Sequence, residues 1–414
     1  MKVVFCSPGL TYLADAPHRT RMCANGMASQ GLKVTVMGFP SSFPADPNSC
    51  AFDYVSVFEL QAPRKRQRWL DWKQKLGPYW THAVEPFLVK RAAFQYARQK
   101  GADVLYVSHV EPWIFLFMAW LNHVSKRRIP TVGMIPYMFR MAAGNSRSAK
   151  IRAWLNEAAV RWLPRYCEIT CDNIHVARLF KVDHYSTLHL IPEGHQELVG
   201  AQSQADARKA LGILTDRRML LLFGVVSQAK GADSLFSAMD GLDPKFMVYV
   251  VGQTGGVYGD SWGPTDRLKE KGWGNDLHVI PRFVSEEEMA QFFSACDGIV
   301  LPYRQGFAVT SGNLMKAIEY GKAIIVSDQY YIGEVVRKHN LGLMFPPENV
   351  EGLRRCLVEF SEKPDSWFEE IRRNSRRVVQ EQSWTNVGAL YRKLFERIVS
   401  PAKPEAVIVR REAN

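Results

Sequence analysis

One segment, residues 299–348, constrains the fold of this chain more than any other part of the sequence. It begins with a short apolar run that ends at Pro302, which is the pattern of a buried strand. A loop of small and polar residues follows, and a helix is expected to begin at Ser311 and to end at Gly321. A second apolar run, residues 323–326, predicts the next strand. Strand, loop, helix and strand in this order form the repeating unit of a parallel α/β sheet.

The start of this helix predicts an anion site. Ser311, Gly312 and Asn313 open the helix, where backbone N–H groups and the positive end of the helix dipole are presented together. A pyrophosphate suits such a site, and its recognition depends more on backbone than on side-chain identity. Arg304 lies in the preceding loop, where it is either a phosphate ligand or an ordinary surface arginine.

Apolar runs alternate with helical stretches along the whole chain, in two series. The expected strands are residues 2–6, 33–37, 53–58, 103–107 and 130–135 in the first series, and residues 219–225, 245–251, 277–280, 299–301 and 324–327 in the second. Such alternation predicts two α/β, doubly wound parallel sheets, each Rossmann-like. No G-x-G-x-x-G motif follows the first strand, so a dinucleotide site of the usual kind is not expected.

The length of 414 residues fits two domains or three. We expect a first domain over residues 1–200, a second over 201–380, a further helix over 381–399 that packs on the first domain, and a tail over 400–414.

Composition narrows the class of protein. No apolar run approaches the roughly 20 residues of a membrane-spanning helix, and the N-terminus resembles a first strand rather than a signal peptide. Seven scattered cysteines favour reduced thiols and a cytoplasmic location, and no spacing of Cys and His predicts a metal site. The net charge of +12 is uneven, because residues 1–200 hold 25 Lys and Arg against 14 Asp and Glu. An anionic membrane or a nucleic acid would each explain this basicity.

Residues 64–80, RKRQRWLDWKQKLGPYW, concentrate that charge. Six basic residues from Arg64 onward are mixed with aromatic residues up to Trp80. This pattern indicates an interfacial membrane segment, an RNA-stacking surface, or a solvated helix with its aromatic side chains in the core. We favour contact with an anionic membrane and do not expect nucleic acid to be a partner.

Several motifs together resemble the GT-B glycosyltransferases, most closely the group 1, or family 4, type. The motifs are a glycine loop from Phe223 to Gly231, a turn at Arg282 and Phe283, the strand ending at Pro302, the helix from Ser311 to Gly321, and Ser383-Trp384 before the last helix. The resemblance covers about residues 210–399 well and residues 1–200 loosely. It implies two Rossmann-like domains, with a C-terminal helix that crosses back to the first.

The resemblance also implies roles for individual residues. A nucleotide-sugar donor would bind the second domain through Lys230, Arg304, Ser311, Gly312, Asn313, Glu319, Arg282 and Phe283. The acceptor would bind the first domain, where the general base that deprotonates a hydroxyl is expected among Asp15, His18 and His109, with Glu111 as a rival to His109. No metal and no further cofactor are implied, and Lys230 would stabilise the leaving diphosphate.

Four positions depart from the family pattern. The arginine that usually follows the loop glycine is Val225 here, and the two glutamates around the phosphate helix are Ala308 and Lys316. The place of the first-domain catalytic histidine holds Pro136. Glu319 lies one turn after Lys316 and is expected to take over a sugar hydroxyl contact. The usual retaining machinery therefore does not transfer intact.

The sequence favours a hexosyltransferase that moves a sugar from a nucleotide-sugar to a hydroxyl acceptor. The acceptor is expected to be a cell-surface polysaccharide or a lipid-linked glycan, used in the cytoplasm or at the inner face of the membrane. Two alternatives stay open, a nucleotide-sugar 2-epimerase of the GT-B fold and a relative that binds a nucleotide-sugar without turnover.

Overall fold

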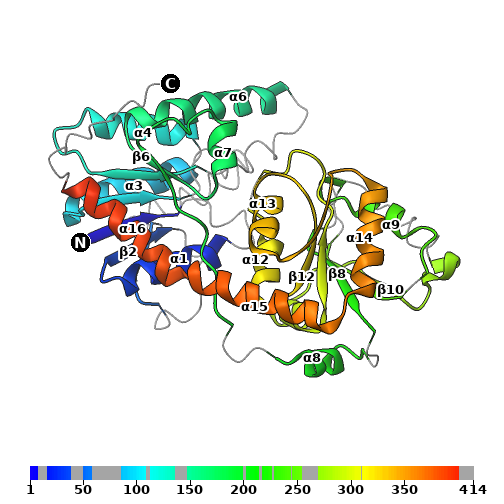
Figure 1. The fold of residues 1–414 in the computed structure, drawn as a ribbon. Coiled ribbons are helices and arrows are strands. Elements are labelled where there is room, and N and C mark those ends of the chain that lie inside the picture. Colours follow the sequence, from blue (N-terminus) through cyan, green and yellow to red (C-terminus); the bar gives the residue numbers. More distant parts are fainter. Residues whose placement is uncertain are drawn as a thin grey trace, which may run out of the picture. The chain divides into compact units, whose positions relative to one another are not determined.

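The structure is a computed structural model, and it describes residues 1–7, 16–38, 50–57, 85–108, 112–135, 147–198, 202–213, 217–225, 228–243, 245–253, 269–308 and 310–400. The chain divides into two compact units (Figure 1). Unit 1 comprises Met1–Gly194 and Trp384–Asn414, and unit 2 comprises His195–Ser383. Each unit is built on its own parallel sheet.

Unit 1 contains a seven-stranded sheet in the order β3-β2-β1-β4-β5-β6-β7. Its strands are β1 Lys2–Cys6, β2 Lys33–Gly38, β3 Asp53–Ser56, β4 Val104–Val107, β5 Thr131–Met134, β6 Glu168–Cys171 and β7 Leu188–Leu190. Val, Leu, Phe and Tyr fill the central strands β1 and β4, which are buried on both faces, as a sheet covered by helices on both sides requires. The strand order reverses between β1 and β4, and in open parallel sheets the carboxyl ends of the strands at such a reversal are where ligands bind.

Helices cover both faces of this sheet. The helices of unit 1 are α1 Ala16–Ser29, α3 Glu85–Lys100, α4 Pro112–His123, α6 Arg147–Trp162, the 3₁₀ turn Leu163–Arg165, α7 Ile174–Leu179 and α16 Trp384–Val399. Phe94 of α3, Phe115 of α4 and Val160 of α6 belong to the core on one face. Met27 of α1 and Phe395 of α16 belong to the core on the other. A separate hydrophobic core therefore lies on each side of the sheet.

The C-terminal helix α16 completes unit 1 by packing along α1 (Figure 1). The two helices approach backbone to backbone, since a Cβ on Gly388 would lie 2.0 Å from the carbonyl oxygen of Gly26. Tyr391 of α16 shares a buried hydrogen bond of 2.8 Å with Tyr106 of β4. The last helix of the chain thus forms part of the core built by the first 194 residues, as the sequence predicted.

Unit 2 contains a six-stranded sheet in the order β10-β9-β8-β11-β12-β13. Its strands are β8 Met219–Phe223, β9 Met247–Val251, β10 Leu277–Ile280, β11 Gly298–Leu301, β12 Ala323–Ser327 and β13 Gly342–Phe345. Here the order reverses between β8 and β11, whose carboxyl ends carry the glycine loop and the loop before the predicted phosphate helix.

Several helices of unit 2 begin where the sequence supplies a side-chain cap. The helices of this unit are α8 Gln204–Ala210, α9 Ala232–Met239, α11 Glu286–Ala295, α12 Gly312–Glu319, α13 Tyr330–His339, α14 Val350–Glu362 and α15 Asp365–Glu381, with a 3₁₀ turn Gln228–Lys230 and a π-helical turn Lys269–Trp273. Ser311 caps α12, and Ser285 with Glu288 forms a capping box on α11.

The predicted fold class, two doubly wound α/β sheets with a crossing C-terminal helix, is confirmed. The first series of strands is longer than expected, because β6 and β7 were not predicted. β7 has only three residues, and none is buried, so it carries little hydrophobic pattern. Among the described residues, no helix has both the length and the hydrophobicity that a membrane-spanning segment needs.

Candidate functional site

The predicted donor site of unit 2 lies at the reversal of strand order between β8 and β11. Lys230, from the 3₁₀ turn after β8, and Asn313, from the first turn of α12, converge on Gly224, which follows β8. A Cβ on Gly224 would lie 3.0 Å from Nζ of Lys230 and 3.5 Å from Nδ2 of Asn313. The Asn313 amide also donates a 2.6 Å hydrogen bond to the carbonyl oxygen of Phe223. A cation and an amide therefore meet beside the start of α12, as a diphosphate site requires.

Gly231 allows this convergence. Its φ of +67° is a left-handed conformation, and it is the cap residue of α9. A Cβ at Gly231 would lie 1.8 Å from the carbonyl oxygen of Pro302, so only glycine permits the loop after β8 to pass so close to the end of β11. Lys230 is placed by this contact, because it directly precedes Gly231.

The start of α12 is held by a buried hydroxyl pair. Oγ of Ser311 accepts a 3.4 Å hydrogen bond from the backbone N–H of Leu314 and lies 2.9 Å from the hydroxyl oxygen of Tyr303. Burial raises the pKa of Tyr303 to about 12, so its hydroxyl stays protonated. The Ser311 side chain is thus engaged within the protein, whereas Gly312 is exposed and presents backbone.

Gln329 was not predicted, yet it organises the loop that follows β11. Its side-chain N–H₂ group donates 2.9 Å hydrogen bonds to the carbonyl oxygens of Tyr303 and Arg304, and its Oε1 accepts a 3.0 Å bond from the backbone N–H of Gly306. Gln329 is buried and directly precedes α13. The only signal in the sequence was a long polar residue two positions after the buried strand β12.

The other predicted donor residues of unit 2 have partners of their own. Arg304 pairs with Asp233 of α9. Arg282 pairs with Glu288 through both carboxylate oxygens, at 2.5 and 3.0 Å, and these bonds lower the pKa of Glu288 to about 2. Phe283 is 73% exposed, so its ring is accessible for stacking. Contact of any of them with a donor stays a prediction.

Glu319 lies at the far end of α12, about 10 Å along the helix from Gly312. Its Oε1 accepts a 2.9 Å hydrogen bond from the backbone N–H of Gln196, and its Oε2 lies 3.8 Å from Nζ of Lys316. Ala308, which stands where the family has one of its two glutamates, is fully buried. The expected sugar contact of Glu319 stays a prediction, and its side chain serves to hold the first residues of unit 2.

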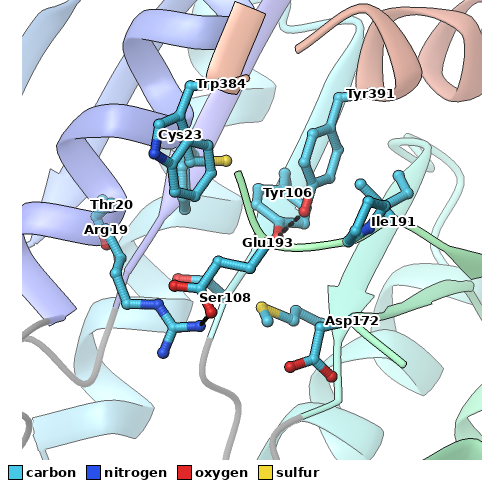
Figure 2. A pocket seen from close by; sticks show the side chains of 13 residues that line it. Arg19, Thr20, Cys23, Tyr106, Ser108, Asp172, Ile191, Glu193, Trp384 and Tyr391 are labelled. Atoms are coloured by element: carbon cyan, nitrogen blue, oxygen red, sulfur yellow. Dashed lines mark hydrogen bonds and ion pairs between the residues drawn. The ribbon is translucent and has the colours of Figure 1, made fainter. Parts of the chain in front are cut away.

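Unit 1 contains a small pocket of about 40 Å³ at the carboxyl ends of its strands (Figure 2). This volume is enough for a small polar group or a few water molecules. Arg19 of α1 and Glu193 form an ion pair on it. Oγ of Ser108, which follows β4, donates a 3.1 Å hydrogen bond to Oγ of Ser7, which is 3.0 Å from Oγ1 of Thr20.

Among the groups lining this pocket, burial raises the pKa of Cys23 to about 12 and also raises the pKa values of Tyr106 and Tyr391 well above their usual range. These three groups therefore stay protonated at neutral pH. Asp172, which follows β6, and Glu193 are the carboxylates of the lining. Neither carboxylate was predicted from the sequence, because the short strand-like run before each of them carries no motif.

The predicted general bases are only partly described. His18 lies on α1, and its Nδ1 is 3.2 Å from a guanidinium nitrogen of Arg21. Asp15, His109, Glu111, Pro136 and the basic aromatic segment of residues 64–80 lie outside the described residues.

All seven cysteines are free thiols, and Cys167 and Cys171 are buried with raised pKa values.

Comparisons with known proteins agree with this architecture. Residues 203–378 match the family model described as Glycosyl transferases group 1. No curated protein sequence matches the chain. Sucrose-phosphate synthase from Thermosynechococcus elongatus superposes with a TM-score of 0.67 at 17% identity, over 97% of this chain and 99% of that one.

Two further solved structures are similar over nearly their full length. Anabaena Alr3699/HepE in complex with UDP has a TM-score of 0.66 at 13% identity, over 96% of this chain and 100% of that one. WaaG, a glycosyltransferase involved in lipopolysaccharide biosynthesis, has a TM-score of 0.60 at 16% identity, over 96% and 99%. The matched residues lie within unit 2, which therefore contains a glycosyltransferase group 1 domain, and the chain as a whole has the GT-B fold of these solved structures.

Proposed function

We propose that this chain transfers a sugar from a nucleotide-sugar to a hydroxyl acceptor, with the donor diphosphate bound by unit 2. The observation that carries this proposal is the convergence of Lys230 and Asn313 on Gly224 beside the start of α12. The HepE structures, which hold UDP and UDP-glucose in the same fold, support a nucleotide-sugar as donor.

The proposed chemistry depends on charge developing on the leaving diphosphate. As the bond to the anomeric carbon breaks, negative charge grows on the diphosphate oxygens, where Lys230 and the N-terminus of α12 stabilise it. Lys230 and the helix start supply this stabilisation without a metal ion or other cofactor. The exposed ring of Phe283 stacks on the base of the nucleotide, and Arg282 stays beside it through its pair with Glu288.

The proposed acceptor group enters the pocket of unit 1 as a single hydroxyl. Arg19, Glu193 and Asp172, which line the pocket, orient this hydroxyl. The acceptor is a growing cell-surface glycan or a lipid-linked glycan at the cytoplasmic face of the membrane, because such a glycan presents one hydroxyl at a time. The fold shared with WaaG supports this choice of acceptor class.

A panel of nucleotide-sugars tests the proposal through release of nucleoside diphosphate. The variant Lys230→Ala is expected to lower kcat/KM by about 10²- to 10³-fold, because a charge aimed at the leaving group is lost. Lys245→Ala is the matched control, since Lys245 is an exposed lysine that precedes β9 at the opposite end of the sheet and pairs with Glu362. EDTA is expected to leave the rate unchanged.

The same panel separates the alternatives. Interconversion of two donors without transfer would identify a 2-epimerase. Donor binding with neither transfer nor hydrolysis, in the presence of membrane extract as a source of acceptor, would identify a binding relative. Equal activity of Lys230→Ala and Lys245→Ala would overturn the assignment of Lys230.

A further inference from the structure

Helix α4 of unit 1 leaves an apolar stripe uncovered. Trp113, Phe117, Trp120 and Leu121 are between 39% and 49% exposed, and Val124, just after the helix, is 60% exposed. Their spacing of three and four residues places them along one side of the helix. The opposite side, with Phe115 and its neighbours, fills the core, so the helix is apolar all round.

Helix α6 repeats this arrangement. Ile151, Trp154, Leu155 and Trp162 are between 43% and 66% exposed and again fall along one side. α4 and α6 pack side by side over the same face of the sheet, because each connects neighbouring parallel strands of it in the same direction (Figure 1). Their outward stripes together form one surface, which we call the α4–α6 face.

The uncovered side chains are unusual in kind as well as in number. Five of the nine are aromatic side chains that stay more than two-fifths exposed, namely Trp113, Phe117 and Trp120 on α4 and Trp154 and Trp162 on α6. Isolated exposed apolar residues are common on proteins, whereas a cluster on two adjacent helices marks a surface that is covered in use.

Basic residues border this face. Lys126, Arg127 and Arg128 are exposed directly after α4. On α6 and the turn after it, Lys150, Arg161 and Arg165 lie at the same helical spacing as the apolar stripe, and all three are exposed. The guanidinium of Arg165 lies 4.2 Å from the centre of the Trp162 ring. Glu157 is the acidic residue of α6, and it lies 3.8 Å from Arg161.

We propose that the α4–α6 face docks unit 1 on an anionic lipid bilayer. Tryptophan and phenylalanine rings prefer the boundary between head groups and acyl chains, and the surrounding lysine and arginine side chains are attracted to anionic head groups. The positive border of the α4–α6 face is complementary in charge to an anionic bilayer, and it would repel the same basic border on a second copy of this chain. Docking does not depend on the proposed reaction, so failure of one leaves the other standing.

Sedimentation with vesicles tests this inference on the full chain in the absence of any nucleotide. The vesicles are phosphatidylcholine alone, or phosphatidylcholine mixed with phosphatidylglycerol. The chain is expected to bind the mixed vesicles and not the neutral ones. Binding is expected to fall at least tenfold in a charge variant, Lys126→Gln with Arg127→Gln and Arg128→Gln, and in an aromatic variant, Trp113→Ser with Trp120→Ser and Trp154→Ser.

A control variant replaces three exposed cations of unit 2, as Lys245→Gln with Lys338→Gln and Arg355→Gln. It carries the same loss of charge and is expected to keep full vesicle binding. Circular dichroism and thermal unfolding check that each variant is folded, and the charge variant, which touches no core residue, keeps the test valid should the aromatic variant fail to fold.

Three results would overturn the inference. One is equal vesicle binding by the wild-type chain and the charge variant. Another is loss of binding only when Arg64, Lys65, Arg66 and Arg68 are replaced, which would assign docking to that segment alone. The third is a concentration-dependent dimer in sedimentation velocity that the aromatic variant abolishes, which would make a second copy the occupant.

Discussion

At the scale of single residues, the site of unit 2 depends on groups that burial or backbone conformation places. Gly231 permits the approach of two loops, and Gln329 fixes the loop after β11 through three hydrogen bonds. His195, the first residue of unit 2, is also placed by burial, but at the far end of α12 beside Glu319. Its side chain is 1% exposed, and its Nδ1 lies 3.9 Å from Glu319 without a hydrogen-bond partner among the described residues.

Unit 2 is expected to lose stability between pH 6.5 and about 4 because of His195. Burial, with a smaller contribution from His339, lowers the pKa of His195 from 6.5 to about 4. In this window the unfolded chain binds a proton that the folded chain does not, so stability falls with falling pH, by up to about 3 kcal/mol. The variant His195→Asn removes this dependence.

Urea unfolding of both proteins at pH 7 and pH 4.5 measures the effect as a difference of differences. The other titrating groups contribute equally to both proteins and cancel. The same change in unfolding free energy in the wild-type chain and in His195→Asn would contradict the assignment to His195.

At the scale of elements, α16 belongs to the core of unit 1 although about 190 residues separate it from the rest of that unit. Small residues at the crossing of α1 and α16 make this possible. A Cβ on Gly26 would lie 2.2 Å from the carbonyl oxygen of Trp384, and one on Gly388 would lie 2.0 Å from that of Gly26. Larger side chains at either position would separate the helices and uncover Tyr391 and Phe395.

The substitution Gly388→Ala is expected to destabilise unit 1 by about 1–3 kcal/mol, because overpacking outweighs the gain in helix propensity. Thr385→Ala, an exposed change in the first turn of the same helix, is the control and is expected to shift stability by less than about 0.5 kcal/mol. Thermal unfolding followed by near-ultraviolet circular dichroism gives both values. A stability of Gly388→Ala at or above that of Thr385→Ala would show that the helices can separate without cost.

At the scale of the whole molecule, two sheets with separate hydrophobic cores predict two cooperative unfolding transitions. A nucleoside diphosphate is expected to raise only the transition of unit 2, by about 2.7 kcal/mol at a hundredfold excess over its Kd. Calorimetry with and without UDP measures this, and Lys230→Ala is expected to remove most of the shift. A shift of both transitions, or of the transition that Gly388→Ala also affects, would place the nucleotide elsewhere.

The sequence predicted the elements that carry a strong pattern. The runs of Val, Ile and Leu in β1, β8 and β11 and the Ser311 cap of α12 were recognised, because burial on both faces and capping leave clear signals. β7 was missed, because three half-exposed residues carry no periodicity. Asp172, Glu193 and Gln329 were missed for a related reason, since a lone polar residue after a strand looks the same whether it faces a site or solvent.

The sequence by itself determined the two parallel sheets, the glycine loop and the helix start that suits a diphosphate, because periodicity, glycine and caps act locally. Only the tertiary structure decided which side chains meet there. Lys230 and Asn313 are 83 positions apart in the chain, and Arg19 and Glu193 are 174 apart. Contacts between residues so far apart in the chain arise from the strand order and from the close approach of loops that glycine permits. The outward direction of the aromatic stripes on α4 and α6 also depends on the tertiary structure. No local pattern encodes them.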